Sequence, residues 1–311
     1  MASNDPGRGS PVVASLPVAD AHHHVWDLEL KAHPWLAGEP LASFRYGDYS
    51  AIQRNYLPAD YRRDTAHFNV VKTVYVEAEW DPRDPIGETR WMHETAAREG
   101  LPNAMVAQAW LDRPDAEQVL AEQAAFPLVR SVRHKPKSAA RPQDAKRSAP
   151  GSMDCPRWRD GFALLAGHRL HFDLQTPWWH LDAAAELAQD FPATTIILNH
   201  TGLPADRTPE GLAGWRSAME LLAHQPNVAV KISGLGVPGR RWTAELQRPV
   251  VRDAIAIFGA ERAMFASNYP VDALVATFDE IYGSFLEITR ELPEAARRRL
   301  FHDNAVRIYR L

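Results

Sequence analysis

The chain has 311 residues, 45% of them hydrophobic, so it is long enough to bury one large core or two modest ones. Lys and Arg number 35 against 39 Asp and Glu, and the net charge of −4 argues against a partner that is nucleic acid or a membrane surface. The single cysteine, Cys155, excludes an internal disulfide and a Cys-rich zinc module, which favours a cytoplasmic protein, and no apolar run reaches the roughly 18–20 residues of a membrane-spanning helix.

The N-terminal end differs in composition from the rest of the chain. Residues 1–16 are rich in Gly, Pro and Ser and lack the continuous apolar segment of a signal peptide. We therefore predict a disordered leader over residues 1–16, one domain over residues 17–311, and no export.

Eight short apolar segments rich in Val, Ile and Phe follow one another through that domain, and each is predicted to form a strand. By residue number they are 17–25, 70–79, 103–111, 128–134, 169–175, 194–200, 227–233 and 262–268. Helical periodicity lies between them, for instance over 88–99, 116–125, 181–189, 215–224 and 249–258, the last beginning at a proline that suits a first helical turn. Strand and helix alternate, so the sheet is expected to be parallel. Eight such units predict a single-domain α/β fold, a (β/α)8 TIM barrel, with a doubly wound open sheet as the alternative.

Two insertions interrupt the regular units, and both are expected to lie over the mouth of the barrel. The first covers residues 27–64 and is rich in aromatic side chains. Counting the residue just before it, these are Trp26, Trp35, Phe44, Tyr46, Tyr49, Tyr56 and Tyr61. The second covers residues 135–152 and is basic and Pro-rich, which is typical either of a lid or of a solvated surface loop.

The first predicted strand carries three successive histidines. Side chains alternate along a strand, so His22 and His24 are expected to point together into the barrel while His23 points away. Two neutral imidazoles on one face provide half of a tetrahedral zinc site. The alternative is a pair of hydrogen-bonded histidines in a chain that holds 13 of them.

Polar side chains fall within or at the ends of seven of the eight predicted strands, and the C-terminal mouth of a barrel is where chemistry collects. These residues are His22, His24, Glu77, His134, Gln175, His200, Ser233 and Asn268. Among them, Glu77, His134 and His200 are expected to converge on the histidine pair. Gly202 allows a sharp turn after the sixth strand and leaves His200 at the mouth.

Several motifs, in order along nearly the whole chain, resemble the amidohydrolase superfamily and, more narrowly, its amidohydrolase-2 group. They are Asp20-Ala21-His22-x-His24-x-Trp26-Asp27, His33-Pro34-Trp35-Leu36, Val132-Arg133-His134, Phe172-Asp173-Leu174-Gln175, Asn199-His200-Thr201-Gly202, Val230-Lys231-Ile232-Ser233-Gly234-Leu235, Met264-Phe265-Ala266-Ser267-Asn268-Tyr269-Pro270-Val271-Asp272 and Asn304-Ala305-x-x-Ile308-Tyr309.

This resemblance implies a barrel enzyme that hydrolyses an ester-like or amide-like bond. Sugar-acid lactonases and a pyrone-dicarboxylate lactonase belong to the group, so a small lactone is the leading substrate class. In the site, His22, His24 and His200 either hold a divalent metal such as Zn or, without metal, polarise the carbonyl directly. A decarboxylase or lactone isomerase of the same superfamily, and a barrel that binds a ligand without turnover, are the alternatives.

Family members commonly end the eighth strand with an aspartate that serves as general base, and this sequence has Asn268 there. An amide cannot take a proton from water, so another carboxylate is needed, either Glu77 or Asp272. Burial of Glu77 would raise its pKa unless a neighbouring cation opposes the rise. The alternatives are a structural ion pair with Lys or Arg for Glu77 and a turn or helix cap for Asp272.

Four further residues are candidates for binding the substrate. Arg133 suits a carboxylate or a salt bridge at the barrel rim, and His134 and Gln175 suit a hydroxylated ring. Lys231 is either an oxyanion donor or a structural partner of an acid such as Glu77. The partner is therefore expected to be a small-molecule substrate, and a homo-oligomer is left open.

Overall fold

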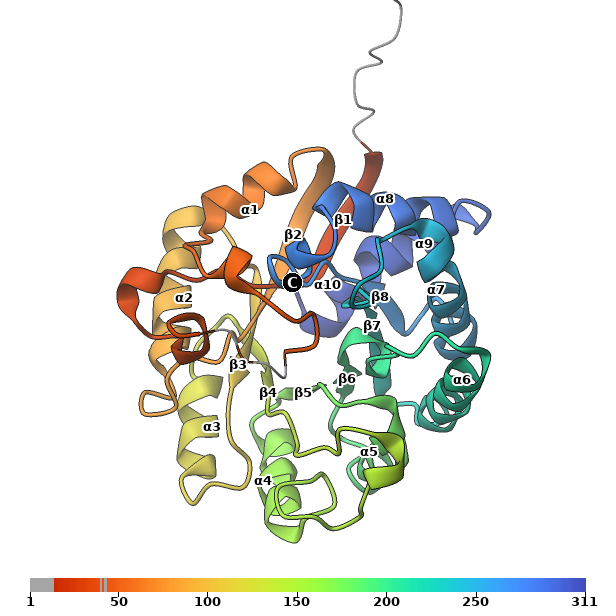
Figure 1. Cartoon of the computed structure of the whole chain (residues 1–311). Coiled ribbons are helices and arrows are strands. Elements are labelled where there is room, and N and C mark those ends of the chain that lie inside the picture. Colours follow the sequence, from red (N-terminus) through yellow and green to blue (C-terminus); the bar gives the residue numbers. More distant parts are fainter. Residues whose placement is uncertain (1–13, 40, 42–43) are drawn as a thin grey trace, which may run out of the picture.

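A computed structural model describes residues 14–39, 41 and 44–311 of the chain (Figure 1). Eight parallel strands pair in sequence order from β1 to β8, each neighbour hydrogen-bonded to the next. Their bounds are β1 Ala14–His23, β2 Phe68–Val76, β3 Ala104–Gln108, β4 Val129–Arg133, β5 His171–Leu174, β6 Ile196–Leu198, β7 Val228–Ile232 and β8 Ala263–Phe265. The unreversed order confirms the predicted barrel over a doubly wound sheet, whose strand order reverses at a switch point.

The barrel closes between β1 and the segment that follows β8. The backbone N–H of Asn268 donates to the carbonyl of His22 at 2.8 Å, and that of His24 donates to the carbonyl of Tyr269 at 2.7 Å. These two bonds place His22 and His24 next to Asn268, the residue that stands where family members commonly have an aspartate.

Helices surround the strands, as Figure 1 shows. They are α1 Pro58–Asp64, α2 Gly87–Glu99, α3 Ala116–Ala124, α4 Pro156–Gly167, α5 Leu181–Asp190, α6 Pro209–Ala223, α7 Ala244–Phe258, α8 Phe278–Ile288, α9 Glu294–Arg298 and α10 Asn304–Tyr309. Among the described residues, no helix is long and apolar enough to cross a membrane.

Two predicted helix starts are wrong. Helix α7 begins at Ala244 rather than at Pro249, because the Thr243 side chain accepts a hydrogen bond from Leu246 N and caps the helix one turn earlier. Helix α6 begins at Pro209 rather than at residue 215, since Thr208 caps it and its proline occupies the first turn. Of the predicted leader, residues 1–13 lie outside the described residues, and β1 already includes residues 14–16.

The interior of the barrel is filled by small and branched side chains from alternate positions of the strands. Ala19 and Ala21 of β1 pack with Val74 and Val76 of β2, and helix α10 adds Tyr309 to the same cluster. The interior is therefore a packed plug, and space for a ligand is left only above it, at the C-terminal mouth.

Candidate active site

The first strand presents its histidines as the alternation predicts. The Nε2 atoms of His22 and His24 lie 3.2 Å apart, both rings buried inside the barrel. The ring of His23 faces the other way, 4.4 Å from the ring of Tyr61 between centroids. His24 Nδ1 lies 2.8 Å from the carbonyl oxygen of Val76, and because a carbonyl only accepts, this nitrogen carries the proton. Its Nε2 therefore keeps a lone pair.

His200 reaches the same place from the sixth strand. It follows β6 in a left-handed backbone conformation (φ 55°), and its ring centroid lies 4.7 Å from that of His22. Its Nδ1 is 2.9 Å from the Ser233 hydroxyl, whose proton has no other acceptor among the described residues. Gly234 makes this approach possible, because a Cβ there would come within 2.6 Å of His200 Nδ1.

Cations and burial together keep these imidazoles neutral. Burial lowers the pKa of His24 well below its usual value, and the Arg133 charge adds to the effect. Burial likewise lowers the pKa of His200, followed by the charges of Arg45 and Arg133. Near neutral pH both rings therefore have one protonated and one unprotonated nitrogen.

Asn268 stands between the histidine pair and a buried carboxylate. Its Oδ1 lies 3.4 Å from His24 Nε2, and its Nδ2 donates to Asp272 Oδ1 at 2.6 Å. Tyr46 donates to the same oxygen at 3.0 Å and Arg45 at 3.4 Å. Burial raises the pKa of Asp272, although Arg45 and the two neutral donors oppose the rise. Asp272 is fully buried and hydrogen-bonds to Asn268, which lies between it and His24.

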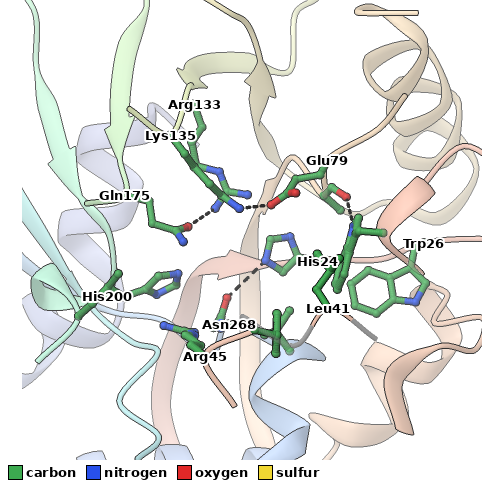
Figure 2. Close-up of a pocket in the computed structure, with 15 residues that line it drawn as sticks. His24, Trp26, Leu41, Arg45, Glu79, Arg133, Lys135, Gln175, His200 and Asn268 are labelled. Carbon is green, nitrogen blue, oxygen red and sulfur yellow. Dashed lines mark hydrogen bonds and ion pairs between the residues drawn. The ribbon is translucent and has the colours of Figure 1, made fainter. Parts of the chain in front are cut away.

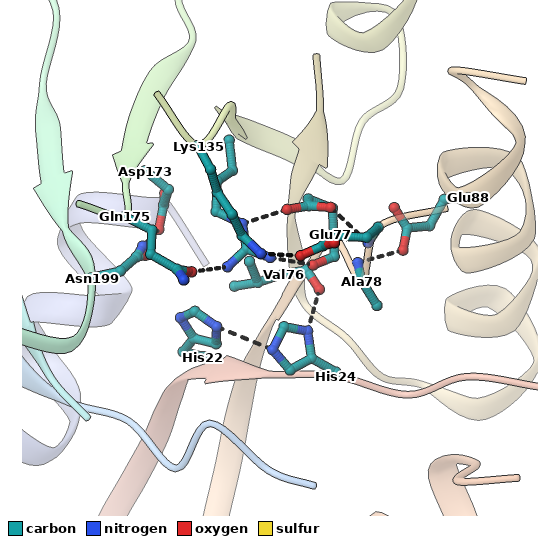
Figure 3. A network of polar contacts seen from close by, with 12 residues as sticks. His22, His24, Val76, Glu77, Ala78, Glu88, Lys135, Asp173, Gln175 and Asn199 are labelled. Atoms are coloured by element: carbon teal, nitrogen blue, oxygen red, sulfur yellow. Dashed lines mark hydrogen bonds and ion pairs between the residues drawn. The ribbon is translucent and has the colours of Figure 1, made fainter. Parts of the chain in front are cut away.

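Figure 3 shows the network of polar contacts around Glu77, and Arg133 is the ion-pair partner of Glu77 in it. Arg133 pairs through Nε with the Glu77 carboxylate, donates to the Glu77 carbonyl at 2.7 Å, and donates to Gln175 Oε1 at 3.0 Å. Burial alone would raise the pKa of Glu77, but the charges of Arg133 and Lys135 outweigh it and the pKa is lowered. Arg133 is thus a neighbouring cation that opposes the effect of burial, and the ion pair considered as the alternative for Glu77 is present.

Lys231 pairs with Asp173, not with Glu77. Its Nζ donates to Asp173 Oδ1 at 2.6 Å, and the Tyr309 hydroxyl lies 2.9 Å from the same oxygen. Both charged side chains are completely buried within the barrel. Lys231 is therefore part of the interior plug below the mouth.

A cavity of about 290 Å³ opens above the histidines (Figure 2). Its polar wall is formed by His24, Arg45, Glu79, Arg133, Lys135, Gln175, His200 and Asn268, and its apolar wall by Trp26, Trp35, Leu41, Phe44, Ala78, Leu203 and Val271. The first insertion thus supplies an aromatic wall at the mouth, as predicted. We call this space the first cavity.

The other predicted site residues lie outside the first cavity. Glu77 and His134 line a neighbouring cavity, and His134 Nδ1 accepts a hydrogen bond from Leu111 N at 3.1 Å while its ring stacks on Trp158. The convergence predicted for these two residues with the histidine pair is therefore wrong. His134 follows Arg133 directly, and the strand's alternation turns only one of the two toward the histidines.

Sequence reasoning missed three charged residues of the first cavity, Arg45, Glu79 and Lys135. Arg45 lies in the irregular first insertion, where no periodicity assigns a direction to a side chain. Glu79 has a left-handed backbone (φ 59°), which aims its carboxylate across the mouth to Lys135. A resemblance based on strand-end motifs carries no signal for such loop residues.

The residues fit only part of a zinc site. Two nitrogens on one zinc lie about 3.3 Å apart, given Zn–N bonds of about 2.0–2.1 Å, and the 3.2 Å between His22 and His24 matches this. Among the described residues, however, no group of three or more His, Cys, Asp or Glu is gathered to hold a metal. His22 Nδ1 is buried without a hydrogen-bond partner, whereas a ligating histidine donates its other N–H. With Asn268 neutral and Arg133 nearby, the donor set lacks the anion that would balance a dication.

Comparison with known proteins adds a family to this geometry. The sequence pattern of the amidohydrolase family matches residues 19–311. The protein y4mH of Sinorhizobium fredii is 41% identical over 96% of this chain and all of its own length, and an L-fucono-1,5-lactonase of Burkholderia ambifaria is 29% identical over 94% and 95%. A crystal structure of an amidohydrolase from Burkholderia multivorans with bound zinc is 25% identical, with a TM-score of 0.79 over 94% of this chain and 99% of that one.

Proposed function

Because the chain belongs to the amidohydrolase family of hydrolases, we propose that it opens a small lactone ring by adding water to the ring carbonyl. A sugar-acid or dicarboxylate lactone is the substrate class, in keeping with the lactonase activity named for its relative from Burkholderia ambifaria. The observation that carries the proposal is that His24 and His200 line one cavity, His24 with Nδ1 bonded to the Val76 carbonyl and His200 with Nδ1 2.9 Å from the Ser233 hydroxyl.

His24 is the proton acceptor in this proposal. Its Nδ1–H is committed to the Val76 carbonyl, so the lone pair that receives a proton from the attacking water lies on Nε2, 3.2 Å from His22 Nε2. This assignment replaces Glu77, whose carboxylate is neutralised by Arg133. Asp272 becomes a positioning residue, which orients Asn268 beside His24 and holds Arg45 at the mouth.

His200 is the carbonyl donor. When the Ser233 hydroxyl donates to its Nδ1, the proton of the neutral ring lies on Nε2 and is available to the carbonyl oxygen. Negative charge develops on that oxygen as the tetrahedral intermediate forms, and Arg45 and Arg133 add positive potential. The ring C–O bond then breaks, His24 returns its proton to the departing ring oxygen, and the product is a hydroxy acid that releases one proton to solvent.

A pH-indicator assay over a panel of sugar-acid and dicarboxylate lactones tests the proposal, before and after exhaustive chelation with metal add-back. We expect proton release that survives chelation and falls at least about a hundredfold in His24→Gln and His200→Gln, the usual loss when a proton-transfer group is removed. His67→Asn, a change at an exposed surface histidine, is the matched control. No release from any lactone would refute the proposal and leave decarboxylation, isomerisation or simple binding. Release lost on chelation and restored by one ion would instead make His22 and His24 metal ligands.

A further inference from the structure

A second cavity of about 390 Å³ lies beside the first at the mouth of the barrel. It is built on the ends of β2, β3 and β4, whereas the histidines of the first cavity come from β1 and β6. Its lining residues are Pro34, Trp35, Glu77, Glu79, Trp80, Pro82, Gln108, Trp110, Arg133, His134 and Lys135. Four of these, Trp35, Glu79, Arg133 and Lys135, line the first cavity too.

The charges of the second cavity cancel within its own wall. Glu77 pairs with Arg133 and Glu79 pairs with Lys135, which leaves no net charge from these four residues. Burial lowers the pKa of His134, so it is neutral near pH 7. In the first cavity, by contrast, Arg45, Arg133 and Lys135 face only one lining carboxylate. The second cavity is therefore suited to an uncharged ligand.

Three indole side chains lie in the wall of the second cavity, and neighbouring groups hold each of them in place. Trp35 donates its N–H to the Ala78 carbonyl at 2.8 Å, and Trp80 stacks on Trp91 with 6.0 Å between ring centroids. The guanidinium of Arg113 lies 5.0 Å from the ring centroid of Trp110. Fixed aromatic surfaces bind rings at a low cost in side-chain entropy.

Gln108 supplies an unused polar group at the end of β3. It is only 3% exposed, yet its Nε2 is buried without a hydrogen-bond partner among the described residues. A buried amide without partners costs free energy, and a ligand hydroxyl, which both donates and accepts, satisfies such a group. Indole side chains together with a neutral amide side chain and balanced charge are the features that recognise a neutral, polyhydroxylated ring.

The Glu79–Lys135 ion pair lies between the two cavities and belongs to both walls. Its side chains are 52% and 38% exposed, so solvent screens the pair and it opens at little cost. Glu79 keeps its position through a left-handed backbone conformation that a non-glycine residue adopts only at some expense. A substrate that spans this pair would occupy both cavities at once.

We propose that the second cavity is a binding subsite for a neutral hydroxylated ring attached to the reacting lactone, so that the enzyme prefers a glycosylated lactone to a single-ring one. This inference rests on the proposed lactone hydrolysis for its substrate, but the subsite itself is defined by Trp110, Trp80 and Gln108, none of which touches the first cavity.

The test compares kcat/KM for gluconolactone with kcat/KM for its glucosylated forms, cellobionolactone and maltobionolactone, in wild type and in Trp110→Ala. We expect the wild type to favour one of the two-ring lactones, and the preference to fall roughly tenfold in Trp110→Ala through lost binding energy of the remote ring. Trp179→Ala is the matched control, since this half-buried indole lies near the mouth but lines neither cavity. The ratio is measured within one protein preparation, so a partly unfolded variant does not imitate the effect.

Calorimetric titration with cellobiose, which has no lactone, separates the two proposals. If no lactone is hydrolysed but cellobiose binds the wild type and Trp110→Ala loses that binding, the subsite stands and the proposed reaction fails. If gluconolactone is hydrolysed while the two-ring lactones are not, or while Trp110→Ala leaves the ratio unchanged, the subsite is refuted and the reaction stands. If no lactone is hydrolysed and cellobiose does not bind, the proposed reaction and the proposed subsite are both refuted.

Discussion

Glu77→Gln separates a structural role of this carboxylate from a catalytic one. The change keeps the shape of the side chain but removes the charge opposite Arg133, whose side chain is 4% exposed. Arg133 keeps its bonds to the Glu77 carbonyl and to Gln175, yet neither carries a negative charge. Breaking a buried pair by neutralising one partner costs about 3–5 kcal/mol, because the other charge is left uncompensated. We therefore expect the free energy of unfolding to fall by about that amount.

Urea unfolding at 25 °C and neutral pH measures this loss, and the double variant Glu77→Gln/Arg133→Met controls for it. Removing both charges leaves no stranded cation, so we expect the double variant to regain at least about 2 kcal/mol relative to Glu77→Gln. In the lactone assay, Glu77→Gln should keep measurable kcat, because Arg133 stays bonded to the Glu77 carbonyl and to Gln175 and because His24, not Glu77, accepts the proton. A variant within about 1 kcal/mol of wild type that loses kcat at constant KM would show that Glu77 itself acts on water.

Three further predictions follow from the buried histidines. Because burial and Arg133 lower the pKa of His24 well below its usual value, kcat/KM should stay level as the pH falls from 8 through 6.5 and decline only at lower pH. A decline of kcat/KM centred on pH 6.5 in stopped-flow measurements would contradict a buried histidine base. Burial lowers the pKa of His23 to about 3, so below pH 6.5 only the unfolded state takes up its proton, and stability is lost as the pH drops toward 3. In chemical unfolding between pH 6 and 4, the free energy of unfolding of His23→Phe should therefore fall less steeply than that of the wild type, by about 1.4 kcal/mol per pH unit. The same slope in both proteins would contradict this role of His23. Gly234→Ala places a methyl within 2.6 Å of His200 Nδ1 at a left-handed position (φ 60°), so activity should fall at least tenfold. A steady-state assay measures the loss, and circular dichroism checks that the variant is folded; full activity in a folded variant would contradict the prediction.

Much of the fold follows from patterns that act locally. All eight strands lie within or overlap the predicted segments, because a strand covered on both faces reads as a short apolar run whatever its neighbours are. The opposite directions of His22 and His23 follow from the strand period alone. The start of α7 was missed because Pro249 reads locally as a first turn, while the Thr243 cap lies six residues earlier.

The sequence left ion pairs open for Glu77, Arg133 and Lys231 but did not assign their partners, because the partners depend on the layers of the barrel. Side chains in one layer come from alternate strands. Lys231 of β7 accordingly pairs with Asp173 of β5, and Arg133 of β4 pairs with Glu77 just after β2. A pairing of Lys231 with Glu77 would have joined an odd strand to an even one.

The amide at position 268 and the poor fit to zinc have one electrostatic explanation. An aspartate there would place a negative charge 3.4 Å from His24 Nε2, whereas Asn268 leaves the Asp272 carboxylate one hydrogen bond further away. Without that anion, no unpaired carboxylate lies beside the histidines to balance a dication, because Asp272 and Glu77 already pair with Arg45 and Arg133. The charges of these arginines still lower the pKa of His200, and the same positive potential favours an oxyanion on the substrate carbonyl, which is the charge that a metal would otherwise stabilise. We infer that in this chain Arg45 and Arg133 stabilise the oxyanion that a metal ion would otherwise stabilise. An Asn268→Asp variant should therefore bind Zn²⁺ more tightly than the wild type in calorimetry.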